Sequence, residues 1–183
     1  MKWVKVVESG TQEQDPPATR MQYDEFHCPL TLDPKGRLTL PAQLRSALGK
    51  AGVEQLVAVA NQGNRGGLSF FTPDDYRRVV KGRVRDADPF ARNTVVYLRA
   101  VDSTSQTLDI DGSGRVLVPA LLRKLAGFEK ELVAFSSLDW FEVWDSQRWE
   151  RAFDQAMDLW DEQTGPDSLA GLPGGPQAGG KER

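Results

Sequence analysis

Short apolar stretches separated by Gly, Pro, Asp and Asn fill the first half of the chain. Their lengths and their β-branched and aromatic content predict strands rather than helices. The predicted strands cover residues 26–32, 38–40, 55–60 and 68–71. Between the first two, Asp33-Pro34-Lys35-Gly36 has the residue order that a type I turn prefers. The pattern therefore predicts a tight hairpin there.

Helices are predicted between these strands and near the C-terminus. Pro41 suits a first helical turn, and Gly49 stands where a left-handed C-terminal cap is expected. Thr72, as N-cap before Pro73, begins a second helix that is expected to run to about Gly82. A last helix over 146–162 has one apolar face with an acidic face opposite. Its tryptophans are expected to pack on the strands or on a neighbouring subunit.

One segment of the chain occurs twice. Residues 33–45 return as residues 111–123 at a constant offset of 78, and the register continues to Gly49 and Gly127. The second copy predicts strands at 108–111, 116–118, 131–135 and 140–144, with a helix over 119–126. The offset is 73 where Phe71 matches Trp144, so the inner loop over 136–139 is expected to be shorter. The repeat indicates one supersecondary unit used twice.

Composition and charge limit the class of protein. The hydrophobic content of 39% and the charged content of 27% are ordinary for a globular protein, and we expect a soluble, cytoplasmic chain without a membrane segment. The net charge of −3 argues against a nucleic-acid partner. However, residues 139–183 hold 10 acidic and 4 basic side chains, so the acidity is concentrated at the C-terminus. A basic run over 77–92 is expected to be a solvated helix face.

No pattern of catalytic residues is found in the sequence. The only histidine, His27, adjoins the only cysteine, Cys28, but neighbouring residues of a strand point to opposite faces. Asp109-Ile-Asp111-Gly-Ser113-Gly114 resembles the start of a calcium loop, although Ala120 stands where a bidentate Glu is needed. We therefore expect no enzyme, no metal or other cofactor and no small-molecule substrate.

The repeated Asp and Arg are the strongest candidates for chemistry. Asp33 and Asp111 can accept backbone N–H groups within their turns and pair with Arg37 and Arg115. In one interpretation the pairs only close the hairpins. In the other, each Asp also orients its guanidinium toward phosphate or guanine. The two interpretations are compatible.

These residues resemble the MraZ family of bacterial transcriptional regulators, which is built from two SpoVT/AbrB-like domains. The family pattern of Asp-x-x-x-Arg, Pro and a short helix ending in Leu-Arg occurs from Asp33 to Arg45 and again from Asp111 to Arg123. Residues 140–145, with Trp149, are similar to the family's closing strand and helix. The resemblance covers residues 22–160.

The resemblance implies an α+β fold, in which two SpoVT/AbrB-like repeats form a pseudo-twofold β-barrel with short flanking helices and a C-terminal amphipathic helix. The expected organisation is a disordered extension over 1–21, domain 1 over 22–76, a basic helical connector over 77–99, domain 2 over 100–162 and a disordered tail over 163–183.

The resemblance also implies a sequence-specific regulator that binds double-stranded DNA. It would act as a repressor of the division and cell-wall gene cluster, binding tandem promoter repeats as a ring-like homo-oligomer in the bacterial cytoplasm, associated with the nucleoid. The DNA-binding residues would be Arg37 and Arg115, assisted by Lys35, Arg45 and Arg123. The turn residues that orient the arginines would be Asp33, Gly36, Asp111 and Gly114.

Two alternatives remain open. An antitoxin-like protein of the same fold would use its tail to wrap a toxin. A structural ring protein would use its Asp and Arg pairs only to close hairpins and would have no affinity for DNA.

Overall fold

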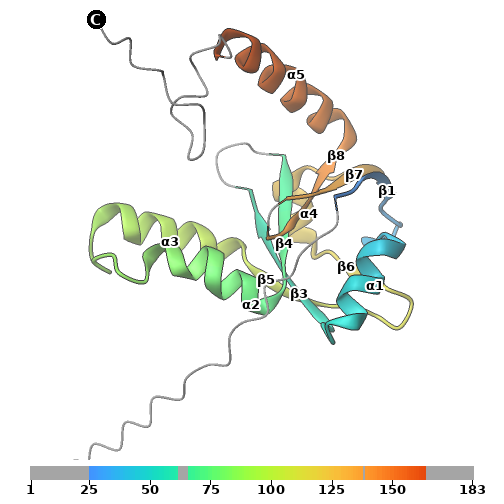
Figure 1. Ribbon diagram of the computed structural model, residues 1–183, viewed down its shortest axis with the longest axis horizontal. Helices are drawn as coiled ribbons and strands as arrows, with labels where there is room; N and C mark the ends of the chain where they lie inside the picture. Colours follow the sequence, from blue (N-terminus) through green and yellow to red (C-terminus); the bar gives the residue numbers. More distant parts are fainter. Residues whose placement is uncertain (1–24, 62–65, 138, 164–183) are drawn as a thin grey trace, which may run out of the picture.

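The computed structural model describes residues 25–61, 66–137 and 139–163, which form two antiparallel sheets with helices around them (Figure 1). The larger sheet has six strands. Their order is β1 (His27–Thr31), β7 (Glu131–Ser136), β8 (Phe141–Asp145), β4 (Gly67–Phe71), β3 (Gln55–Ala60) and β5 (Gln106–Asp109). The smaller sheet pairs β2 (Arg37–Thr39) with β6 (Arg115–Leu117). Residues 1–21 and most of the expected tail lie outside the described residues.

Strands of the two repeats are interleaved: along the larger sheet they belong to the first, second, second, first, first and second repeat. β1 pairs with β7, β4 with β8 and β5 with β3, so every one of these contacts joins one repeat to the other. The smaller sheet also joins the repeats, because Leu38 lies opposite Val116, its own counterpart at the offset of 78. A pseudo-twofold axis therefore passes through this pair.

The core is built from equivalent apolar residues of both repeats. Leu38, Val116, Leu56 and Leu132 have no exposed surface. Phe70 stacks on Phe141 with ring centroids 5.0 Å apart, which ties β4 to β8 through their side chains as well as their backbones. Because each repeat supplies half of this cluster, neither repeat encloses the core alone.

Helices surround the sheets on different sides. α1 (Ala42–Lys50) and α4 (Ala120–Ala126) each follow a strand of the smaller sheet. A helical arm, residues 73–104, consists of α2 (Pro73–Asp75), the π-helical η1 (Tyr76–Lys81), the 3-10 turn η2 (Gly82–Val84) and α3 (Arg92–Thr104). In Figure 1 the arm lies on the side away from α1, and α5 (Ser146–Gln163) extends from the end of β8.

The second-repeat helix ends as predicted, and the first does not. Gly127 has φ of 64° and caps α4, while Phe128 N–H donates to the Arg123 carbonyl at 3.0 Å. In the first repeat, however, Gly52 takes the left-handed conformation, with φ of 67°, and Val53 N–H donates to Leu48 at 2.9 Å. The expectation for Gly49 is wrong, because it lies within α1. The capping glycine of the first repeat therefore lies three residues later than the repeat indicates, and the same 6→1 capping bond forms there.

This longer helix changes the register of the repeat. The offset is 78 at Leu30 and Leu108, 75 at the capping glycines, 76 at Leu56 and Leu132, and 73 at Thr72 and Asp145. The inner loop therefore accounts for the fall of the offset from 76 to 73. The end of the first helix lowers the offset from 78 to 75, and one residue is regained before the next strand.

The mixed α+β class with an antiparallel sheet is confirmed. The strand pairing gives two sheets, linked by isolated bridges between Leu32 and Leu38 and between Ile110 and Val116. The predicted closed barrel is thus not confirmed for the described part of the chain. No helix in the described ranges is long and apolar enough to cross a membrane.

Truncation at the pseudo-twofold axis is predicted to destabilise both repeats together. We expect Leu38→Ala to lower the free energy of unfolding by about 2–5 kcal/mol, because it removes a fully buried side chain. Leu117→Ala, on the exposed face of the same ribbon, should change it by less than about 0.5 kcal/mol. Urea unfolding, followed by tryptophan fluorescence, measures both values. Two separate transitions in the wild type would contradict the shared core.

Candidate nucleic-acid interface

The first Asp-to-Arg turn is closed by a network centred on one carboxylate. Asp33 Oδ1 accepts the backbone N–H groups of Lys35 and Arg37, each at 2.8 Å. Asp33 Oδ2 accepts from Arg37 Nε at 2.7 Å. Gly36, with φ of 83°, lets the chain return so that Asp33 N–H reaches the Arg37 carbonyl at 2.8 Å. The turn thus holds the Arg37 side chain in one direction by its Nε.

The second turn has the same geometry. Asp111 Oδ1 accepts from Ser113 N–H at 2.8 Å and from Arg115 N–H at 3.0 Å. Asp111 Oδ2 lies 2.8 Å from both Nε and Nη2 of Arg115. Gly114 has φ of 71°. The two turns therefore present their guanidinium groups in equivalent ways.

Backbone hydrogen bonds lower the pKa of both aspartates. The largest cause for Asp33 is the N–H of Arg37, and for Asp111 it is the N–H of Arg115. The side-chain bonds to the same arginines lower each pKa further. Both lowered pKa values favour the ionised carboxylates, which are the forms that pair with the arginines.

The two arginines lie on one face of the β2–β6 ribbon. Leu38 and Val116 face the core, so the residues next to them face outward. In the register, Arg37 lies opposite Leu117 and Arg115 lies opposite Thr39. The arginines are therefore diagonal neighbours, a relation that places side chains roughly 7–8 Å apart. The ribbon face is defined by Arg37, Thr39, Arg115 and Leu117.

Arg45 and Arg123 cover the turn of the opposite repeat. A Cβ atom on Gly114 would lie 2.0 Å from Cδ of Arg45, and one on Gly36 would lie 2.8 Å from Cζ of Arg123. Arg123 Nε also donates to the Val118 carbonyl at 3.0 Å. The glycines thus leave space for arginines that come from helices α1 and α4 of the other repeat.

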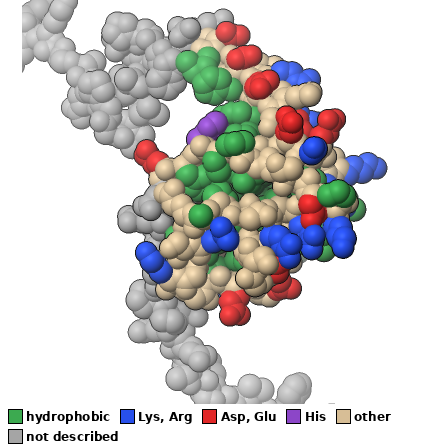
Figure 2. Space-filling model, turned by 90° about the vertical axis from the view of Figure 1, so that its right-hand side faces the viewer, with side chains coloured by type: hydrophobic (Ala, Val, Ile, Leu, Met, Phe, Trp, Pro, Cys, Tyr) green, Lys and Arg blue, Asp and Glu red, His purple; other side chains and the backbone are tan. Residues whose placement is uncertain are grey.

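All five basic residues proposed from the sequence therefore gather at the two turns. Lys35, Arg37, Arg45, Arg115 and Arg123 stand against two carboxylates, Asp33 and Asp111, so the cluster has net positive charge. Figure 2 shows the side of the molecule that carries α1, where Lys and Arg side chains form a band. A protein with net negative charge thus presents a locally basic surface.

The sequence reasoning did not identify Thr39 and Leu117. Both are exposed, and Leu117 keeps 56% of its surface accessible. The alternation of faces along a strand could have identified them. Thr39 and Leu117 each come two residues after a candidate arginine, so each shares the face of that arginine. They are equivalent positions of the repeat but differ in chemistry, so the ribbon face is not symmetric.

The other candidate groups lie elsewhere. Cys28 packs against the main core, where burial raises the pKa of its thiol, while His27 lies beside Phe135 and Trp149 on the opposite face. In the basic run, Arg78 lies 2.5 Å from Asp75, and Lys81 pairs with Asp102. The described residues contain no cluster of three or more potential His, Cys, Asp or Glu metal ligands.

Comparison with known proteins identifies relatives over most of the chain. The family model described as "MraZ protein, putative antitoxin-like" matches residues 103–164. A Heliobacterium modesticaldum protein named transcriptional regulator MraZ is 33% identical over 132 residues, which are 72% of this chain and 87% of that protein. A Corynebacterium urealyticum protein of the same name is 36% identical over 65% of this chain and 78% of that protein. A similar protein from Treponema denticola is 30% identical over 66% and 81%.

The second turn is predicted to lose stability if a side chain at position 114 fills the space that Arg45 occupies. Gly114→Ala places a side chain at positive φ and against Arg45, so we expect a loss of at least about 1–2 kcal/mol in the free energy of unfolding. Gly112→Ala is the matched control in the same turn, because its Cβ would meet no atom within 4 Å. Urea unfolding of both variants is the measurement. Equal stability of the two variants would contradict this account.

The lowered pKa values predict acid sensitivity. A carboxyl group with a lower pKa in the folded state stabilises the fold above its unfolded pKa, and this contribution is lost as pH falls through the folded pKa. We therefore expect part of the stability to disappear below about pH 4. In Asp33→Asn/Asp111→Asn, this acid-dependent part should shrink. Unfolding free energies measured between pH 7 and pH 2.5 test this, and an unchanged slope in the double variant would refute it.

Proposed function

The chain belongs to the MraZ family, and on that premise we propose that it is a transcriptional regulator that binds double-stranded DNA through the β2–β6 ribbon face. The single observation that carries the proposal is the pairing of two Asp-oriented arginines on one outward face. The relatives named as transcriptional regulators support the regulatory role.

The shape of the ribbon suits the major groove. That groove admits a two-stranded β-ribbon, and guanine presents two acceptors there that an arginine can bind bidentately. Asp33 engages Nε of Arg37, and Asp111 engages Nε and Nη2 of Arg115. The remaining donors at the end of each side chain are then available to base edges. Orientation before binding also lowers the entropy that each arginine loses.

The other basic residues have supporting roles. Lys35, exposed at the tip of the first turn, is suited to contact phosphate as a point charge. Arg45 and Arg123 hold the opposite turns and present their charge at the rim of the same surface. Thr39 and Leu117 give the two halves of the face different contacts, with Leu117 suited to a thymine methyl group.

We further propose that the protein assembles as a ring-like homo-oligomer that binds tandem promoter repeats. Several copies of this small basic face along one duplex raise the affinity by effective concentration, which compensates for a net charge of −3 per chain. The target would be the division and cell-wall gene cluster, with repression as the outcome, in the cytoplasm at the nucleoid.

The proposal includes an organisation of the chain. Each Asp-to-Arg turn, with its helix and following strands, would be one SpoVT/AbrB-like domain, over 22–76 and 100–162, joined by the helical residues 77–99. The two isolated bridges at Leu38 and Val116 lie where the smaller sheet would complete a barrel-like core with the larger one.

A second candidate function follows from the family model's description. An antitoxin-like role would add a bound toxin as partner. A toxin that co-purifies with the full chain at constant stoichiometry would support this role. The tail sequence over 164–183 is rich in Gly and Pro and contains few apolar residues for wrapping a partner.

Removing the oriented arginines is predicted to weaken DNA binding without unfolding the protein. Arg37→Ala and Arg115→Ala should each cost about 1–3 kcal/mol in binding to a promoter fragment from upstream of the protein's own gene. Arg151→Ala, an exposed arginine on α5, is the control and should bind like wild type. Mobility shift or fluorescence anisotropy at several salt concentrations measures these effects.

The salt dependence separates the proposed function from a purely structural ring. Wild-type affinity should fall steeply as salt rises, because phosphate contacts release counterions. If folded Arg37→Ala and Arg115→Ala variants bind the fragment as tightly as wild type, the assignment of the ribbon face is wrong. If the wild type has no affinity for the fragment at low salt, the structural alternative is favoured.

A further inference from the structure

Helix α5 carries its apolar stripe beyond the body of its own chain. At its start, Trp149 packs on Phe135 with centroids 4.3 Å apart and on Trp144 at 5.7 Å. One and two turns later, Phe153 and Met157 keep 48% and 43% of their surface exposed. The stripe therefore continues after the contacts with the sheet have ended. In Figure 1 this part of the helix projects away from the sheets.

An amphipathic helix normally buries its apolar stripe. Two large apolar side chains that stay exposed one turn apart on this stripe are consequently an incomplete contact, and a partner that covers them gains the free energy of their burial. Such a partner needs an apolar cavity for the two side chains and a charge opposite to that of α5.

The helical arm provides such a surface. A cavity of about 360 Å³ opens between the arm and strands β3 and β4, and we call it the arm cavity. Its walls are largely apolar, with Val59, Phe71, Val79, Tyr97 and Val101 among the lining residues. Arg83 also lines it. The volume is suited to one or two large side chains and lies on the side of the sheet away from α1.

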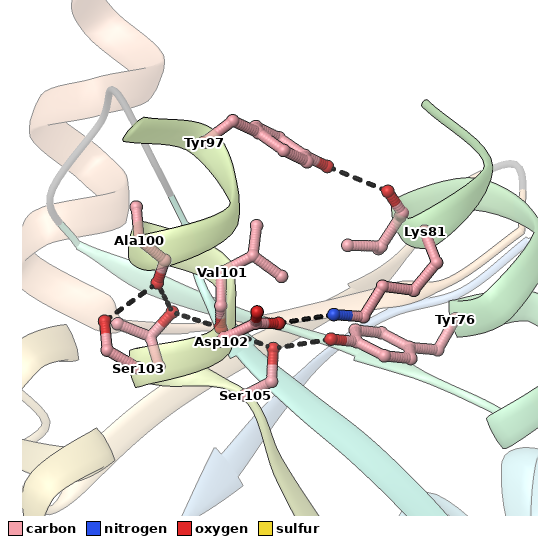
Figure 3. A network of polar contacts seen from close by, with 10 residues as sticks. Tyr76, Lys81, Tyr97, Ala100, Val101, Asp102, Ser103 and Ser105 are labelled. Atoms are coloured by element: carbon pink, nitrogen blue, oxygen red, sulfur yellow. Dashed lines mark hydrogen bonds and ion pairs between the residues drawn. The ribbon is translucent and has the colours of Figure 1, made fainter. Parts of the chain in front are cut away.

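A polar network holds together the two helical segments of the arm that line this cavity. Figure 3 shows Tyr76 donating to Ser105 and Tyr97 donating to the Val80 carbonyl, at 3.0 and 3.1 Å. Lys81 pairs with Asp102 across the same two helical segments. These contacts fix η1 relative to the end of α3, so the arm residues that line the cavity are held in place in a single chain.

Charge is complementary between the arm and α5. The arm, residues 73–104, contains seven basic and five acidic side chains, whereas residues 146–163 contain five acidic and two basic ones. Among the described residues, Arg83, Arg85 and Arg92 are exposed and have no acidic partner. On α5, Glu150 and Asp154 each follow a stripe residue, so they lie at one edge of the stripe.

We propose that α5 of one copy inserts Phe153 and Met157 into the arm cavity of a second copy, with Glu150 and Asp154 facing the arm's arginines. This inference rests on the homo-oligomer proposed above and names its interface. Because α5 packs on β7 and β8 while the arm packs on β3, donor and acceptor are different surfaces of the chain. The contact is therefore head-to-tail, and its repetition closes a ring or extends a filament.

The charges disfavour the simplest rival, a symmetric pairing of two α5 helices. That arrangement would bring two helices of net charge −3 together. Like charges across an interface oppose association, whereas the head-to-tail contact joins opposite charges.

Two complementary variants test the interface. The α5 variant is Phe153→Ser/Met157→Ser, and the arm variant is Val79→Gln/Arg83→Glu, in the full chain. Each variant alone should sediment at the monomer mass of 20.3 kDa, while the wild type sediments at a multiple of it. An equimolar mixture should form a species of twice that mass, because the intact arm of one variant accepts the intact α5 of the other.

Matched controls separate loss of the interface from loss of folding. Gln155→Ser is exposed on α5 but off the stripe and should assemble like wild type. Thermal unfolding by circular dichroism checks that each variant is folded. If the double arm variant unfolds, Arg83→Glu alone replaces it, with an expected weakening of association of about tenfold or more. That factor corresponds to the loss of about 1.4 kcal/mol.

Three results would overturn the proposal. They are a monomeric wild type, a folded arm variant that still assembles, and a mixture that remains monomeric. The second of these would indicate pairing of α5 with itself. The readout does not involve DNA, so Arg37→Ala/Arg115→Ala should assemble normally. If the wild type assembles through this contact but binds no DNA, the proposed function fails and the interface stands.

Discussion

Cross-repeat pairing around Leu38 and Val116 is the constraint on which the rest of the structure depends. The two residues are equivalent, lie opposite each other and are fully buried. Their burial fixes which face of each short strand looks inward, and so places Arg37 and Arg115 together on the other face. A slip of one residue in either strand would turn the arginine of that strand toward the core.

The crossing of α1 and α4 over the turns reinforces this arrangement. Arg45 lies on Gly114, and Arg123 lies on Gly36, so each repeat supplies the cover for the other repeat's turn. Two hydrogen bonds run the same way, from Leu40 N–H to the Gly114 carbonyl and from Val118 N–H to the Gly36 carbonyl, each at 2.9 Å. The glycines therefore have two functions, to provide positive φ and to leave space for an arginine side chain of the other repeat.

The distribution of charge reconciles an acidic protein with the proposed DNA partner. The basic cluster at the turns, the basic arm and the acidic α5 are separate surfaces of one chain. In the proposed assembly, the acidic helix is neutralised by the arm of the next copy, and the turns remain free for phosphate and base contacts. Affinity then depends on how many ribbon faces reach one duplex, more than on the charge of a single chain.

The sequence by itself determined the local features. The Asp-to-Arg turns, the capping role of Thr72, the left-handed Gly127 and the extent of α5 follow from hydrogen bonds and dihedral preferences within a few residues. The left-handed glycine that ends the first helix was predicted at Gly49 but is Gly52, because α1 extends to Lys50 and so includes Gly49.

Only the tertiary structure decided how the repeats combine. Which strand pairs with which, the crossing of Arg45 and Arg123, and the exposure of Leu117 depend on partners in the other repeat, far away in the sequence. A repeat in sequence states that two units are alike, and it does not state whether they lie apart or interleave. That choice depends on burial of the apolar faces of both units in one core, which is a property of the whole chain.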